Sequence, residues 1–238
     1  VGVVRRHVGR LRDRGIHPHL RGGLDVHMLA RRHVVRREEI IRQLLQGRDV
    51  FAAMPTGGGK SLCYQLPALS LKGLTIVVSP LIALMHDQVE AARQNGIHAD
   101  YLPSSLPEDE VRQVFLRLYA SEVSLLYISP ERFARRSFRE RLREFSPVLF
   151  AVDEAHCISE WGHEFRPDYL SLSSIKKEFP EASIAAFTAT ATKRVQNDIV
   201  ERLNMENPYI LRASFNREEL FYRVSRKDDP LHQILSFI

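Results

Sequence analysis

The chain has 238 residues, of which 44% are hydrophobic and 26% charged, ordinary values for a globular protein with a sizeable core. The formal net charge is +5, but residues 1–37 hold ten arginines and two acids, so this segment carries +8 and the remainder −3. These values exclude a uniformly basic protein. No apolar run approaches the length of a membrane span, and we expect no secretory signal.

Residues 1–37 are rich in arginine and histidine without a helical or strand period, and proline and glycine interrupt them. We expect a disordered or otherwise atypical basic arm. Electrostatic contact with DNA phosphates is the alternative, and a stretch read out of frame is a third interpretation.

From Glu38 onward, short apolar runs alternate with helical stretches. We expect strands at residues 50–54, 74–79, 124–129, 148–153 and 183–188. We expect helices at residues 38–46, 61–71, 81–95, 107–119, 130–145 and 193–203, the last capped by Thr192. This alternation predicts an α/β fold, a parallel sheet with helices on both faces, whose ligands bind at the carboxyl ends of the strands.

After Pro208 the pattern changes. Strands at residues 209–215 and 220–225, followed by a helix from Asp228, indicate a second unit that the chain only begins. We therefore expect an N-terminal arm over 1–37, one domain over 38–208, and a linker with the start of another domain over 209–238.

A glycine-rich turn joins the first expected strand to the helix that follows it. The turn reads Pro55, Thr56, Gly57, Gly58, Gly59 and is followed by Lys60 and Ser61. Such a turn directs backbone N–H groups at phosphate oxygens, and a Cβ atom would block the approach. Lys60 would reach the β- and γ-phosphates of a nucleotide, and Ser61 would help to hold Mg²⁺. The strict phosphate-loop pattern has glycine where this chain has Met54, and a glycine-rich turn with a surface lysine is the alternative.

An acidic box follows the apolar run 149–152 and reads Asp153-Glu154-Ala155-His156. It should lie at the same sheet edge as Lys60. Asp153 would hold Mg²⁺ through a water, Glu154 would orient and deprotonate an attacking water, and His156 would sense the γ-phosphate. The alternative is an acidic loop with a hydrogen-bonded histidine.

Five ordered motifs together resemble the RecQ family of superfamily 2 DNA helicases over roughly residues 38–225. They are PTGGGKS, SPLIALMHDQV, YISPERF, DEAHCISEWGHEFRPDY and AFTATAT. The resemblance implies a RecA-like motor lobe that uses Mg·ATP to move 3′→5′ along single-stranded or forked DNA. It also implies DNA repair or recombination, repair or replication proteins as further partners, and a cytoplasmic, in bacteria nucleoid-associated, location. By the same resemblance, Thr188 and Thr190 couple hydrolysis to strand separation, and the DNA backbone meets Ser79, Pro80, Ser129 and Arg132.

Residues 159–167 resemble the aromatic-rich loop of that family. Trp161 and Phe165 offer faces on which bases can stack, Arg166 adds charge, and we count His163 among the DNA contacts. The alternative places both aromatic residues in the core.

Three departures from the family limit the expectation. Arg37 stands where the family has its adenine-reading glutamine, so we expect phosphate binding without adenine recognition. The family's second lobe, with its arginine finger, does not follow within this chain. Only two cysteines are present, so the family's zinc-binding part is also missing and we expect no zinc.

Three functions remain open. The first is the motor lobe of an ATP-dependent DNA helicase, weak or inactive by itself. The second is a catalytically incompetent fragment that binds nucleotide and DNA. The third, an RNA helicase of the related DEAD-box kind, is disfavoured by the form of the acidic box and by the aromatic loop.

Overall fold

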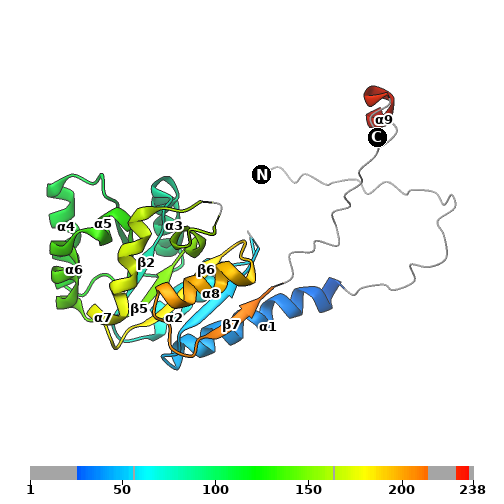
Figure 1. Ribbon diagram of the computed structural model, residues 1–238. Helices are drawn as coiled ribbons and strands as arrows, with labels where there is room; N and C mark the ends of the chain where they lie inside the picture. The colour runs from blue at the N-terminus through cyan, green and yellow to red at the C-terminus, as the bar shows by residue number, and fades with distance from the viewer. Residues whose placement is uncertain (1–25, 56, 163, 214–228, 236–238) are drawn as a thin grey trace.

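The computed structural model describes residues 26–55, 57–162, 164–213 and 229–235. Within them, seven strands form one sheet in the order β3-β4-β2-β5-β6-β1-β7, and every neighbouring pair is parallel (Figure 1). The strands are β1 (Val50–Ala53), β2 (Leu74–Val78), β3 (Ala99–Leu102), β4 (Leu125–Ile128), β5 (Pro147–Val152), β6 (Ser183–Thr188) and β7 (Tyr209–Arg212). The predicted parallel α/β fold is confirmed.

Helices cover both faces of the sheet. The longer ones are α1 (Val26–Leu45), α2 (Lys60–Ser70), α3 (Ile82–Gln94), α4 (Glu108–Tyr119) and α8 (Lys193–Arg202). The shorter ones are α5 (Pro130–Ala134), α6 (Arg136–Leu142), α7 (Ile175–Glu178), α9 (Pro230–Leu235) and the 3₁₀ turns η1 (Arg143–Phe145), η2 (Ala155–Ile158) and η3 (Pro167–Ser174).

The sheet separates two apolar cores, because successive side chains of each strand point to opposite faces. In β1, Phe51 and Ala53 join the core under α4, α6 and α8, whereas Val50 and Ala52 join the core under α1, α2 and α3. All four side chains are buried. Burial on both faces explains why these strands are apolar throughout rather than alternating.

Three expectations from the sequence need correction. Helix α1 begins at Val26, so residues 26–37 are helical where the sequence predicted a disordered or otherwise atypical arm; residues 1–25 lie outside the described residues. The single helix expected over 130–145 breaks at Arg135, whose backbone is extended. Strand β3 was missed, because four residues that include a charged Asp100 give little apolar signal.

Strand β7 corrects the predicted domain boundary at residue 208. It pairs in parallel with β1, with Val50 opposite Tyr209, and so completes the same sheet. A second lobe stays a prediction with its start moved beyond β7. The strand predicted over 220–225 lies outside the described residues.

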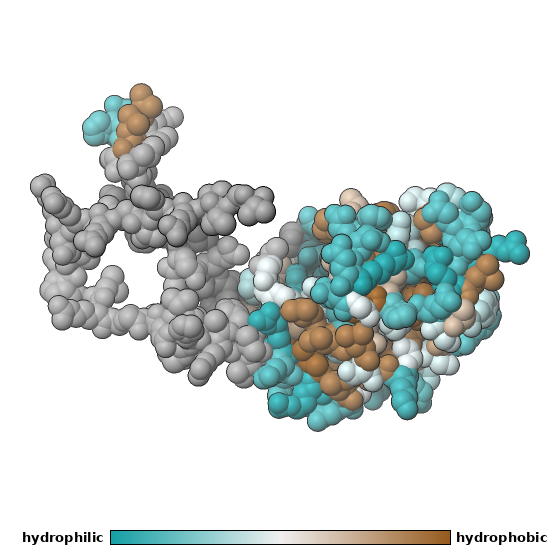
Figure 2. Space-filling view, turned by 180° about the vertical axis from the view of Figure 1, so that it is seen from behind, coloured by the Kyte–Doolittle hydropathy of each residue, from teal (hydrophilic) through white to brown (hydrophobic). Residues whose placement is uncertain are grey.

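One face of the described part of the chain carries an apolar patch. Seen from behind, a hydrophobic patch interrupts the hydrophilic surface (Figure 2). Leu62, Leu66 and Leu69 of α2 are between 43% and 53% exposed.

None of the described helices combines the length and apolar character needed to cross a membrane.

Candidate active site

The candidate site lies along one edge of the sheet, since the carboxyl ends of parallel strands meet there. In sheet order, β4 is followed by Ser129, β2 by Ser79 and β5 by Asp153; β6 ends at Thr188 and β1 leads into the glycine-rich turn. The predicted DNA contacts thus occupy one part of the edge and the predicted nucleotide residues the adjoining part.

The glycine-rich turn has a backbone that only glycine adopts easily. Gly57 and Gly59 have φ angles of 77° and 75°, in the left-handed region. A Cβ atom on Gly58 would lie 2.8 Å from the Pro55 carbonyl oxygen, which accepts a hydrogen bond from the Gly58 N–H. Met54, the departure from the strict pattern, is 3% exposed and packs in the core below the turn. Thr56 lies outside the described residues.

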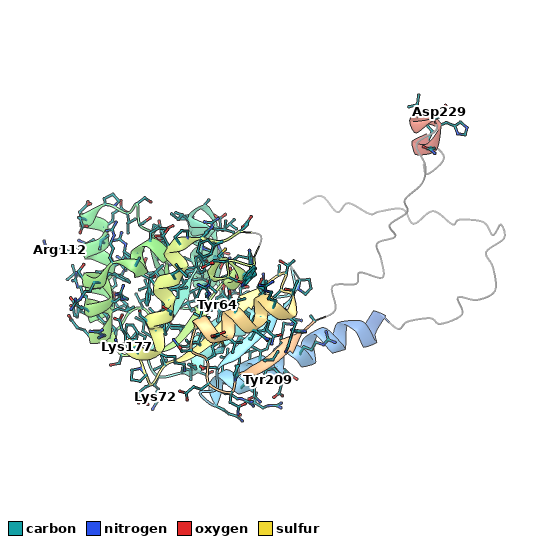
Figure 3. The ribbon with its side chains drawn as sticks, viewed as in Figure 1. Tyr64, Lys72, Arg112, Lys177, Tyr209 and Asp229 are labelled. Carbon is teal, nitrogen blue, oxygen red and sulfur yellow. The ribbon has the colours of Figure 1, made fainter. Side chains whose placement is uncertain are left out.

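Helix α2 begins at Lys60 and is anchored from beneath by Tyr64. The Tyr64 ring makes edge contacts with Tyr127 of β4 and Phe187 of β6, and its hydroxyl lies 3.2 Å from Gln88 Oε1. Tyr64 is seen in the interior, whereas Lys72, Arg112 and Lys177 lie at the periphery (Figure 3). This anchoring fixes the direction in which the first turn of α2, with half-buried Lys60 and Ser61, faces the site.

Lys60 reaches across to the acidic box. Its Nζ lies 3.5 Å from Glu154 Oε1, and the Lys60 side chain is only 14% exposed. Glu154 has φ 46° and ψ 44°, a left-handed conformation that costs a non-glycine residue about 1–2 kcal/mol. This strain turns the chain sharply after β5 and points the carboxylate at Lys60.

His156 connects the box to β6. Its Nδ1 lies 3.2 Å from Glu154 Oε2 and 3.0 Å from Thr188 Oγ1. Hydrogen bonds with Cys157 and then with Glu154 raise the pKa of His156 to about 9, so the imidazole is cationic near neutral pH. The hydrogen bond from His156 is the main cause that lowers the pKa of Glu154. Thr188 in turn donates to the Thr190 carbonyl oxygen and accepts from the Thr190 N–H, at 3.0 and 3.2 Å.

Asp153 is held mainly by its backbone. Its N–H donates to Val78 at 2.8 Å, and its carbonyl accepts from the Tyr169 hydroxyl at 3.0 Å. Burial raises the pKa of the Asp153 carboxyl, while Lys60 opposes the shift. A cation beside a buried carboxylate stabilises its charged form. The Asp153 carboxylate and the Ser61 hydroxyl are oxygen donors, the kind that Mg²⁺ prefers, so the chemistry of these residues fits the predicted ion.

The aromatic loop lies at the surface, which rules out the alternative that its aromatic residues belong to the core. Trp161 is 57% and Phe165 36% exposed. The guanidinium carbon of Arg194 sits 3.3 Å from the centre of the Trp161 ring, a cation–π contact. Glu160, the residue before Trp161, forms an ion pair with Arg202 at 3.1 Å. Two arginines of α8, Arg194 and Arg202, therefore contact the loop.

The loop folds back onto the acidic box. A Cβ atom on Gly162 would lie 2.6 Å from the His156 carbonyl oxygen, and the Arg166 N–H donates to the Cys157 carbonyl at 2.9 Å. Glu164 Oε2 lies 3.9 Å from His156 Nε2. His163 lies outside the described residues.

Three side chains predicted to touch the DNA backbone are buried. Ser79, Ser129 and Arg132 are 4%, 0% and 4% exposed. Arg132 donates to the Pro103 carbonyl at 2.7 Å, and burial lowers its pKa. Ser129 caps α5 by accepting from the Arg132 N–H. These contacts with DNA remain predictions, and the burial favours a role in shaping the loops; Pro80 is half-buried beside them.

Sequence reasoning missed several contacts of the site. Arg37 of α1, expected at the adenine position, lies against the glycine-rich turn, since a Cβ atom on Gly59 would sit 2.6 Å from Arg37 Nη1. Arg194, Cys157 and Glu164 were not singled out. The available signal was proximity in sequence, because Cys157 directly follows the acidic box and Glu164 lies eight residues after it. No sequence pattern indicated the contact of Arg37 with the turn or that of Arg194 with Trp161.

Comparison with known proteins agrees with this geometry. The family model of the DEAD/DEAH box helicase matches residues 36–199. The chain is 47% identical, over 202 residues, to the ATP-dependent DNA helicase RecQ of Haemophilus influenzae, covering 84% of this chain and 32% of that protein. It is 45% identical to the ATP-dependent DNA helicase Q1 of Pongo abelii, covering 84% and 32%. The chain thus spans about a third of the length of these curated relatives.

Solved structures agree on the fold alone. A hypothetical ATP-dependent RNA helicase from Sulfolobus tokodaii superposes with a TM-score of 0.53 at 20% identity, covering 73% of this chain and 51% of that one. The DUF1998 helicase MrfA, bound to DNA and AMPPNP, superposes with a TM-score of 0.59 at 14% identity, covering 78% and 28%.

Proposed function

The chain belongs to the DEAD/DEAH box helicase family, and from this premise we propose that it is the first motor lobe of an ATP-dependent DNA helicase of the RecQ kind. The observation that carries the proposal is the run of contacts from Lys60 through Glu154 and His156 to Thr188. This run joins the ends of β1, β5 and β6, and it supports the proposal that on this edge Lys60 would bind phosphate, Glu154 would act as the base and Thr188 would couple hydrolysis to movement.

The nucleotide would lie on the glycine-rich turn. Backbone N–H groups of the turn and Lys60 would hold the β- and γ-phosphates, and Ser61 and Asp153 would hold Mg²⁺. Bound Mg·ATP supplies the transferable phosphoryl group and a cation that neutralises its charge. At a separation of 3.5 Å, the ion pair between Lys60 and Glu154 is loose. Phosphate oxygens can therefore replace the Glu154 carboxylate as the partner of Lys60.

Glu154 would orient and deprotonate the attacking water. Its lowered pKa keeps it ionised and able to accept a proton. His156 contacts Oε2 of the Glu154 carboxylate, so the other oxygen, Oε1, faces Lys60. Thr188, bonded to the same imidazole, would pass a change at Glu154 to the loop that contains Thr190.

Single-stranded or forked DNA would cross the other part of the same edge. Trp161 and Phe165 would stack on bases, with Arg166 adding charge. Glu164 connects this loop to His156, so a loop that moves on DNA shifts the group that holds Glu154. We also propose that the protein moves 3′→5′ along DNA and has a role in repair or recombination. The similarity to RecQ helicases supports both parts of this proposal.

Arg37 would change how the adenine base of the nucleotide is recognised. A guanidinium only donates hydrogen bonds, so it cannot reproduce both bonds of an amide to adenine. Its place against Gly59 puts positive charge beside the phosphates instead. We expect kcat/KM for ATP and GTP to agree within about tenfold, and Arg37→Gln to raise the preference for ATP.

Steady-state ATP hydrolysis by this chain, with and without single-stranded DNA, tests the proposal. DNA should stimulate turnover, and Glu154→Gln should lower it by about 10²–10⁴-fold while nucleotide binding persists. Glu122→Gln, at an exposed position, is the matched control. Turnover that is equal in both variants would refute the assignment of Glu154.

Nucleotide and DNA binding without turnover is the second candidate. The close packing of Arg37 on the turn favours it, because the side chain occupies space beside the phosphate site. Nucleotide binding that Lys60→Ala abolishes, together with a hydrolysis rate that DNA and Glu154→Gln leave unchanged, would establish this candidate.

A further inference from the structure

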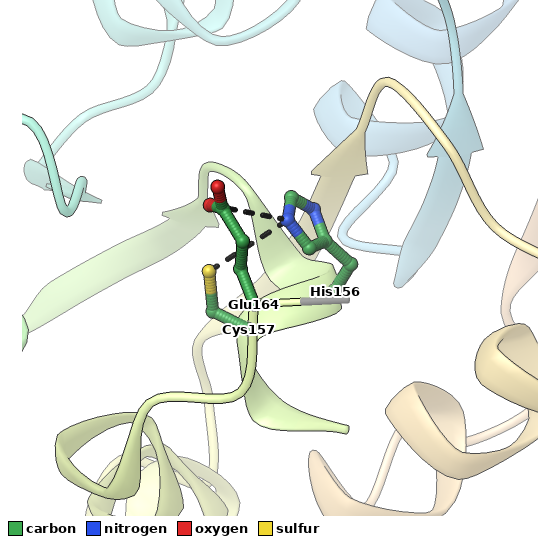
Figure 4. A group of neighbouring side chains, drawn as sticks. All are labelled: His156, Cys157 and Glu164. Carbon is green, nitrogen blue, oxygen red and sulfur yellow. Dashed lines mark hydrogen bonds and ion pairs between the residues drawn. The ribbon is translucent and has the colours of Figure 1, made fainter. Parts of the chain in front are cut away.

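Three metal-ligating side chains converge behind the acidic box: His156, Cys157 and Glu164 (Figure 4). One ligand atom from each lies within 4.8 Å of the others. His156 and Cys157 are buried on η2, and Glu164 extends from the aromatic loop. We propose that these three residues form a binding site for Zn²⁺ or a comparable transition-metal ion. The site is additional to the Mg·ATP site and does not depend on the proposed function.

The distances are close to those of a tetrahedral site. His156 Nε2 lies 3.8 Å from Cys157 Sγ and 3.9 Å from Glu164 Oε2. Zinc bonds of about 2.0–2.3 Å place neighbouring ligand atoms about 3.3–3.6 Å apart. The Glu164 side chain is 59% exposed, so a small rotation can close the remaining gap.

The donor types select the ion. A thiolate, an imidazole and a carboxylate suit zinc or cobalt, whereas Mg²⁺ prefers oxygen donors alone. Three protein donors leave the fourth position of a tetrahedral ion open to water. Two cysteines are too few for a four-cysteine site, so the sequence alone predicts no zinc. The proposed site differs because it adds donors of other types to Cys157.

The surroundings of His156 also fit a metal ligand. Its Nδ1 faces Glu154 Oε2 at 3.2 Å and Thr188 Oγ1 at 3.0 Å. Histidines that bind a metal usually donate their other ring N–H to a carboxylate or similar acceptor, which fixes the tautomer. A bound ion would displace the proton that the cationic imidazole carries on Nε2; with the remaining proton on Nδ1, the Nε2 lone pair would point toward Cys157 and Glu164.

A bound ion would have one structural consequence. It would cross-link the aromatic loop, through Glu164, to the segment that carries Glu154. On the proposed function, this link would oppose movement of the loop and lower the stimulation of ATP hydrolysis by DNA.

Cobalt is the probe that tests the site, because a cysteine thiolate bound to Co²⁺ gives a near-ultraviolet charge-transfer band. Titration of the metal-free full chain should produce this band, and stoichiometric Zn²⁺ should remove it. Cys157→Ser should abolish the band. Cys63→Ser is the control and should keep it, since burial raises the pKa of the Cys63 thiol to about 12 and its Sγ donates to the Gly59 carbonyl.

Two further variants keep the test independent of folding at the buried cysteine. Glu164→Gln, on the exposed loop, should weaken Zn²⁺ binding at least tenfold. Glu154→Gln should weaken it about 10–100-fold through the lost partner of Nδ1. Absence of the band in the unaltered chain, a band that survives Cys157→Ser, or unchanged affinity in Glu164→Gln would each overturn the proposal.

Discussion

The two ends of the sheet hold their charged groups in different ways. At the amino end, Asp49 is 3% exposed and accepts from Lys176 Nζ at 2.8 Å and from the N–H groups of Ile184 and Glu206 at 2.8 and 3.1 Å. At the carboxyl end, Lys60 and Glu154 approach only to 3.5 Å.

The difference separates stability from function. A carboxylate that is only 3% exposed and already accepts three hydrogen bonds is closed to a ligand, and losing it leaves backbone donors unsatisfied. A loose, partly exposed pair contributes little to folding but keeps its charges available to phosphate and water. Substitutions at the amino end should therefore change stability alone, and those at the carboxyl end activity alone.

The largest expected effect is that of Lys60→Ala. Loss of the ammonium should lower ATP turnover by about 10³-fold or more, because charge on the phosphates is then not neutralised. The free energy of unfolding should change by less than about 1 kcal/mol, since the pair with Glu154 is loose. Turnover assays and urea denaturation measure the two quantities, with exposed Lys72→Ala as control. A large loss of stability would contradict the comparison.

Asp49→Ala should give the opposite result. Removing the carboxylate leaves two backbone N–H groups without their acceptor and Lys176 with only the Ala182 carbonyl, at a cost of about 2–4 kcal/mol in the free energy of unfolding. ATP turnover per folded molecule should stay unchanged. Urea denaturation of this variant beside exposed Glu181→Ala tests the expectation. A fall in turnover without loss of stability would show that the two ends of the sheet are coupled.

Gly162→Ala tests whether the aromatic loop belongs functionally to the carboxyl end. The new Cβ atom would meet the His156 carbonyl oxygen at 2.6 Å, so the backbone must move, at a cost of about 1–3 kcal/mol locally. Stimulation of ATP turnover by DNA should fall several-fold, while turnover without DNA should change less. Equal loss in both conditions would mean that Gly162 supports only the acidic box.

The sequence was most informative where strand and motif coincide. The apolar runs before Pro55 and Asp153 predicted strands whose carboxyl ends meet, and the structure brings Lys60 and Glu154 together there. Thr192 was also predicted correctly as a helix cap, accepting from the Val195 N–H. These features depend on residues close in sequence, where periodicity and capping chemistry act directly.

Contacts between distant segments were not predictable. The pairing of Trp161 with Arg194 depends on how the aromatic loop packs on α8, and β7 joins the sheet through its pairing with β1. No local pattern encodes either. Arg132 is a different case: the resemblance suggested contact with the DNA backbone, which stays a prediction, whereas burial of its guanidinium against the Pro103 carbonyl was not predicted.

Arg194→Ala has the smallest expected effect. The guanidinium covers the Trp161 ring at 3.3 Å, and an exposed cation–π contact contributes about 0.5–1 kcal/mol. Trp161 is the only tryptophan, so its fluorescence reports on the loop directly. Acrylamide should quench it more strongly in Arg194→Ala, and affinity for single-stranded DNA should change by less than about fivefold, because the freed ring face offsets the lost positive charge. Lys193→Ala removes the same charge from the same turn of α8 and should leave quenching unchanged. Equal quenching in both variants would mean that Arg194 does not cover the ring in solution.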